Sequence, residues 1–172
     1  MGNLISIHKD ILRNIFRHHL NGTDRLLLLS SLNIQIPLRR THAEIAAENG
    51  HLEVLKWLYE RKCVSYINGI AARHGHVHIL EWQWNLGSYS SWVEGQEAAY
   101  YGHINVLKWL MAKCIQFTNS FYVNAAWGGQ VKVLEWLKKY KCLADKRCVN
   151  LAKTTKHADA LEWIVKNEKY FE

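Results

Sequence analysis

The sequence predicts an all-α chain, in which a solenoid of short helix-turn-helix repeats follows a helical N-terminal cap. One block of residues, with paired alanines, a glycine and a tryptophan, occurs four times after residue 39, and a fifth, decayed copy follows. The tryptophans of successive blocks lie 25, 27, 27 and 27 residues apart. The apolar residues before each tryptophan follow the spacing of a helix. A fixed period of this length indicates stacked units, each burying its apolar face against its neighbours.

The first half of each block predicts a short helix that ends at a glycine. Paired alanines such as Ala46-Ala47 allow neighbouring helices to approach closely, because their side chains are small. Gly50 can then adopt the positive φ that ends many helices. The pattern recurs at Ala71-Ala72 with Gly75, Ala98-Ala99 with Gly102, Ala125-Ala126 with Gly129, and in a decayed form from Ala152.

The second half of each block predicts another helix, which starts directly after the glycine. Leu52, Leu55 and Leu58 fall on one helical face, with Trp57 beside them. We expect these tryptophans to pack between repeats rather than to form a platform for nucleic-acid bases. The five are Trp57, Trp82, Trp109, Trp136 and Trp163. The second block departs from the pattern at Gln83, and its following Gly/Ser-rich stretch, 84–92, predicts a loop.

These blocks resemble the ankyrin repeat, whose core reads roughly T-P-L-H-x-A-A-x-x-G-H-x-x-V-V-x-x-L-L. Ala46-Ala47, Gly50-His51 and Val54-Leu55 match that core, and Thr41 stands where the family has its threonine. The resemblance covers about 41–172. The rest of the T-P-L-H element is missing and the period is about six residues below the usual 33. We therefore expect short or absent β-turn fingers. Short-period, Trp-rich repeats of this kind also resemble those of large DNA viruses of protists.

We expect two domains: an N-terminal helical region over 1–38 and a continuous repeat array over 39–172. The first region predicts two helices around Gly22-Thr23, and it has two interpretations. One is a capping hairpin, because a solenoid needs a polar outer cap. The other is an F-box: 7–16 and 24–29 resemble that family's L-P-x-E-I-L-x-x-I-F and D-L-x-x-L elements, with His8 in place of proline. The second resemblance implies a substrate adaptor that binds a Skp-type component of a ubiquitin ligase.

Gly2 lies in a short pattern for N-terminal myristoylation. Met1-Gly2 followed by Ser6 fits M-G-x-x-x-[ST]. A single acyl chain anchors a protein only marginally, and the basic N-terminal segment could supply a second membrane signal. This pattern, with the viral resemblance, keeps a virion-associated or membrane-associated structural role open.

The net charge and the cysteines bear on the class of protein and its compartment. The formal net charge is +7, which could favour nucleic acid without specifying it. The four cysteines form no CxxC pair, so we expect free thiols in a reducing compartment. Neither a signal peptide nor an apolar run of about 18 residues is visible. We expect a cytoplasmic protein, in the host cytoplasm if the source is viral, with nuclear or virion association as alternatives.

Sequence motifs for catalysis are missing. The sequence contains no P-loop, GxGxxG, HExxH or GxSxG pattern. His51, His76 and His103 occupy the repeat's Gly-His corner, where we expect a histidine to tie the turn together. We therefore predict no enzyme, no cofactor and no metal site.

The ankyrin resemblance implies where a partner would bind. In such arrays the first helices line a concave face, and the two residues between the alanine pair and the glycine point outward there. Tyrosine, tryptophan and arginine are enriched among the energetically dominant residues of protein interfaces. The sequence thus favours a protein-interaction scaffold, with an F-box adaptor or a basic nucleic-acid-binding or virion protein as alternatives. The predicted contact residues are Glu48, Asn49, Arg73, His74, Tyr100, Tyr101 and Trp127.

Overall fold

A computed structural model describes residues 40–64, 66–87, 91–140 and 146–170. These residues form helices joined by short connections, and no strand occurs among them. The all-α prediction is confirmed at this level. The chain divides into two compact units, Met1–Ser65 and Tyr66–Glu172. The cap and F-box interpretations of 1–38, and the acylation pattern at Gly2, lie outside the described residues.

The described part of the first unit is one helix hairpin. Helix α3 spans Arg40–Glu48 and α4 spans Leu52–Glu60. The two helices pack on each other through small residues of α3 and larger apolar residues of α4. The buried residues are Ala43, Ala46 and Ala47 on α3, with Val54, Leu55 and Leu58 on α4. Gly50 joins the helices with a φ of 75°, as the sequence predicts.

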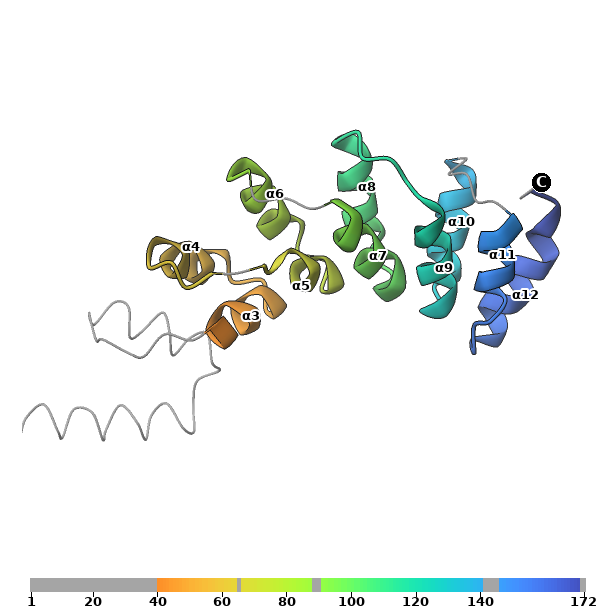
Figure 1. Cartoon of the computed structure of the whole chain (residues 1–172), viewed down its shortest axis with the longest axis horizontal. Helices are drawn as coiled ribbons and strands as arrows, with labels where there is room; N and C mark the ends of the chain where they lie inside the picture. The colour runs from red at the N-terminus through yellow and green to blue at the C-terminus, as the bar shows by residue number, and fades with distance from the viewer. Residues whose placement is uncertain (1–39, 65, 88–90, 141–145, 171–172) are drawn as a thin grey trace, which may run out of the picture. The chain divides into compact units, whose positions relative to one another are not determined.

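The described residues of the second unit form four helix pairs and one final turn (Figure 1). First helices α5, α7, α9 and α11 pack consecutively on one another. Each is followed by its second helix, and α6 packs on α8 and α10 on α12. The bounds are Asn68–Arg73 (α5), Val77–Asn85 (α6), Ser91–Tyr101 (α7), Ile104–Ala112 (α8), Asn119–Trp127 (α9), Val131–Lys139 (α10), Lys146–Ala152 (α11), Ala158–Asn167 (α12) and Glu168–Tyr170 (η1).

Small residues set the spacing between the first helices. The alanine pairs of α5, α7 and α9 are fully buried. A Cβ at Gly95 would overlap the ring of Phe121 on α9, and a Cβ at Gly128 would overlap the carbonyl oxygen of Tyr100 on α7. Only glycine, which lacks a Cβ, leaves room for the Phe121 ring at one position and for the Tyr100 backbone at the other, so these two residues allow α7 and α9 to pack closely.

The expected loop over 84–92 is wrong at its two ends, 86–87 form a turn, and 88–90 lie outside the described residues. Helix α6 continues through Asn85, and α7 already begins at Ser91. Gln83 is buried at the position where the first block has Leu58. Glutamine is a good helix former, so this substitution does not end α6. The helix ends two residues later, at Asn85, and Gly87 takes a positive φ of 69° in the turn that follows.

The repeat tryptophans pack to different extents. Trp136 is buried, with 8% of its surface exposed, which confirms the packing prediction at that position. Its ring lies 5.6 Å from the Phe117 ring and 4.8 Å from the Tyr140 ring. The other four tryptophans of the series are only half-buried. Packing therefore buries only part of the surface of these four side chains.

A polar cluster joins α6 to α8. The indole N–H of Trp109 donates a hydrogen bond to the Glu81 carboxylate, and the Lys113 ammonium donates to the same carboxylate at 2.9 Å. Lys113 also lies 5.2 Å from the centre of the Trp84 ring. The Trp109 and Lys113 hydrogen bonds lower the pKa of Glu81, against the smaller opposing effect of burial.

We expect Glu81→Gln to destabilise the protein more at pH 7 than at pH 3. The folded-state pKa of Glu81 is lowered from the ordinary value of about 4.3. Its stabilising contribution is therefore present above that value and is lost as the pH falls through the lower folded-state pKa. Urea unfolding curves at both pH values measure the effect.

Glu135→Gln is the matched control, because Glu135 holds the same repeat position on α10 and is exposed. It should change the free energy of unfolding little at either pH. An effect of Glu81→Gln that is as large at pH 3 as at pH 7 would contradict this account of the cluster.

Candidate protein-interaction surface

The predicted contact residues of the second unit are exposed. Arg73, Tyr100, Tyr101 and Trp127 lie at the C-terminal ends of three first helices, and His74 follows Arg73 directly. Because α5, α7 and α9 are consecutive neighbours, these side chains fall on one row, which we call the first-helix row. Its three aromatic side chains keep 38%, 44% and 40% of their surface exposed. Repeat packing therefore does not bury them.

Glu48 and Asn49 belong to the first unit. Both are exposed, as the sequence predicts. The Asn49 side-chain amide donates to the carbonyl oxygen of Ile45 at 2.8 Å, so it helps to close the end of its own helix. The first-helix row and the pocket beside it consist entirely of residues of the second unit.

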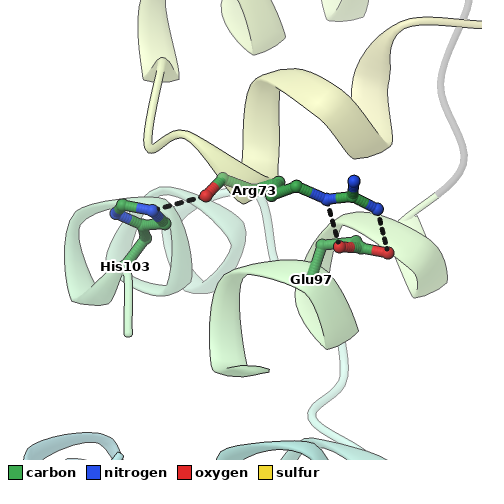
Figure 2. Close-up of polar contacts among 3 residues, drawn as sticks. All are labelled: Arg73, Glu97 and His103. Carbon is green, nitrogen blue, oxygen red and sulfur yellow. Dashed lines mark hydrogen bonds and ion pairs between the residues drawn. The ribbon is translucent and has the colours of Figure 1, made fainter. Parts of the chain in front are cut away.

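Arg73 is held at two points (Figure 2). Its Nε and Nη2 donate to the two carboxylate oxygens of Glu97 on α7, at 3.0 and 3.3 Å. Its backbone carbonyl lies 2.6 Å from Nε2 of His103, and since a carbonyl oxygen only accepts, Nε2 is the donor. A paired guanidinium–carboxylate contact fixes direction as well as distance. Arg73 is therefore fixed by both α7 and the start of α8.

At His103, the Gly-His corner joins two adjacent repeats. The ring of His103 packs over Gly75 in the preceding repeat, where a Cβ would meet it at 2.6 Å. Asn105 donates to the Gly75 carbonyl at 2.8 Å. Gly75, with a φ of 74°, therefore serves two needs: it ends α5 and leaves space for the next repeat.

The aromatic side chains of the row are themselves positioned. The Tyr100 and Tyr101 rings lie 5.0 Å apart at an interplanar angle of 61°. The Arg73 guanidinium lies 5.3 Å from the centre of the Tyr101 ring, within the range of a cation–π interaction. Arg73 thus orients Tyr101 while it pairs with Glu97.

Trp127 is positioned by the following repeat. Its indole N–H donates to the Thr154 hydroxyl at 3.1 Å, and that hydroxyl donates to the carbonyl of Leu151 at 2.7 Å. The indole is therefore fixed at its polar edge while much of its ring surface stays exposed. Such an arrangement lowers the entropy lost when a partner covers the ring.

A pocket of about 230 Å³ opens beside this row, between α5, α7 and α9. It is lined by Arg73, Gln96, Glu97, Tyr100, Tyr101 and Asn124. Arg73, Tyr100 and Tyr101 are among the contact residues that the sequence predicts, whereas Gln96, Glu97 and Asn124 are not. Glu97 and Asn124 each stand directly before an alanine pair, three residues before Tyr100 and Trp127. Since residues three apart share a helix face, that spacing could have identified both.

Other kinds of site are not found in the described ranges. No three His, Cys, Asp or Glu side chains gather there in a group that could hold a metal ion. Cys63 and Cys114, the cysteines whose state is described, are free thiols. None of the helices in this part of the chain has the length and apolar character needed to cross a membrane.

Comparisons with known proteins give no match: no family model fits the chain, and no curated protein is similar to it.

We expect His103→Ala to lower the free energy of unfolding by about 1 kcal/mol, because it removes the hydrogen bond to the Arg73 carbonyl. Urea unfolding of the full chain measures the change. His157→Ala is the matched control: His157 packs over Gly129 in the same way, but its ring makes no hydrogen bond within the described residues. Equal destabilisation by the two substitutions would show that packing, and not the hydrogen bond, joins the repeats.

Proposed function

We propose that this chain is a non-enzymatic, ankyrin-type scaffold that binds a partner protein through the first-helix row. The consecutive packing of α5, α7, α9 and α11 supports the repeat array. The matching alanine, glycine and histidine positions of successive blocks support its ankyrin character. In such an array the residues after each alanine pair are the ones available to a partner.

The observation that carries the proposal is an exposed aromatic group that is already held in place. Tyr100, Tyr101 and Trp127 each keep about two fifths of their surface exposed. Neighbouring side chains fix two of them, through Arg73 and Thr154. Tyrosine, tryptophan and arginine dominate the energetics of protein interfaces, and fixed side chains lose less entropy on binding.

Charge at the pocket favours a protein partner over nucleic acid. Nucleic-acid binding needs Lys or Arg side chains that neutralise phosphates. The arginine that lines this pocket is paired with Glu97 through both carboxylate oxygens. We therefore rank a protein partner first. The free thiols of Cys63 and Cys114 agree with a reducing compartment, and we propose the cytoplasm as the site of action.

The test is affinity purification of partners from nuclease-treated cell lysate, followed by mass spectrometry. Wild type is compared with a Tyr100→Ala, Tyr101→Ala, Trp127→Ala triple variant. We expect a specific protein with the wild type and at least a 30-fold loss of affinity in the triple variant, which corresponds to about 2 kcal/mol. Urea unfolding verifies that the variant is folded.

Trp92→Ala is the matched control. Trp92 is also an exposed aromatic residue of α7, with 59% of its surface exposed, but it lies at the opposite end of that helix from Tyr100. Its loss should leave binding unchanged. Partner binding that survives the triple variant, or that is lost equally in Trp92→Ala, would reject the first-helix row as the binding surface.

A further inference from the structure

The charges that line the pocket between α5, α7 and α9 cancel. Arg73 and Glu97 are its charged lining residues. They are joined by two hydrogen bonds, at 3.0 and 3.3 Å, and 43% and 26% of their side-chain surfaces are exposed. A charged group from a partner would have to compete with this two-point contact. The pocket therefore offers little net attraction to either a cation or an anion.

The remaining lining groups are neutral and can form hydrogen bonds. The Gln96 amide and the Tyr100 and Tyr101 hydroxyls make no hydrogen bond to any other described residue. Asn124 donates its Nδ2 to the Ser120 carbonyl at 2.8 Å, which leaves its side-chain carbonyl to accept. Amides and hydroxyls of this kind offer both donors and acceptors. A peptide group likewise presents one N–H donor and one carbonyl acceptor.

The size of the pocket argues for a segment of a larger molecule. Sites for drug-sized ligands enclose about 300–1,000 Å³, whereas this pocket measures about 230 Å³. Its rim is aromatic, since Tyr100 and Tyr101 are exposed beside it. An occupant that fills the pocket can therefore also cover these rings, which extends the contact beyond the cavity.

We propose that this pocket recognises an uncharged segment of the partner polypeptide. Gln96, Asn124 and the tyrosine hydroxyls hydrogen-bond its amide groups, and the tyrosine rings cover its apolar atoms. The Arg73–Glu97 pair stays intact and orients Tyr101 without contributing net charge. The inference rests on the proposed function and adds the chemical class of the segment that is bound.

The test is selection of binding peptides by the full chain from a displayed library of random 12-residue peptides. Enrichment is scored against the Tyr100→Ala, Tyr101→Ala, Trp127→Ala variant, so that only peptides bound at this surface count. We expect enriched peptides without Asp, Glu, Lys or Arg at the selected positions. The dissociation constant of one such peptide, measured by fluorescence anisotropy, should change less than threefold between 50 and 500 mM NaCl.

Two substitutions locate the contact. Gln96→Ala should lower the affinity for the selected peptide at least tenfold, because it removes a hydrogen-bonding amide from the pocket. Gln116→Ala removes the same group from an exposed position that does not line the pocket, and it should leave affinity unchanged. Equal affinity in wild type and Gln96→Ala would overturn the assignment.

The outcomes separate this inference from the function on which it rests. The enriched peptides could carry a conserved charge, or their affinity could fall tenfold as the salt concentration rises. Either result would overturn recognition of an uncharged segment and would leave the proposed protein binding in place. No enrichment over the triple variant would overturn both. Uncharged peptides with salt-independent affinity that depends on Gln96 are the result expected if both are correct.

Discussion

The close packing of consecutive first helices is the constraint on which the rest of the second unit depends. The alanine pairs at 71–72, 98–99 and 125–126 are fully buried, and α9 touches α7 at two glycines, Gly95 and Gly128. Larger side chains at these places would separate the helices. Because the second alanine of each pair stands three residues before the glycine that follows its helix (Gly75, Gly102 and Gly129), the residues after each pair fall in one exposed row.

The contacts between repeats fix the geometry of that row. His103 bonds the backbone of Arg73 across the repeat boundary, and Glu97 bonds its side chain. The Arg73 guanidinium lies over the Tyr101 ring. The hydrogen bonds that join one repeat to the next therefore also position the exposed side chains of the row. These are the side chains that we propose bind a partner.

Much of the local fold follows from residues that are close in sequence. Ala98-Ala99 and Gly102 predict a helix, its end and the exposure of Tyr100 and Tyr101, because each of these depends on local conformation and spacing. The pairing of Arg73 with Glu97 and the bond from His103 to Arg73 were not predicted. They join residues 24 and 30 positions apart, so they depend on the register of neighbouring repeats. The helical state of 84–85 and 91–92 was not predicted, because the Gly and Ser residues between them favour a loop while helix propensity and packing extend α6 and α7 into the stretch.

The central claim is that a partner covers the first helices of the second unit. Amide hydrogen exchange of the full chain, free and bound to the partner recovered from lysate, tests it most directly. The account predicts slower exchange in the bound state over the C-terminal halves of α7 and α9, including 96–101 and 124–127, with α8 and α10 unchanged. Slower exchange confined to α8 and α10, or to residues before 66, would contradict it.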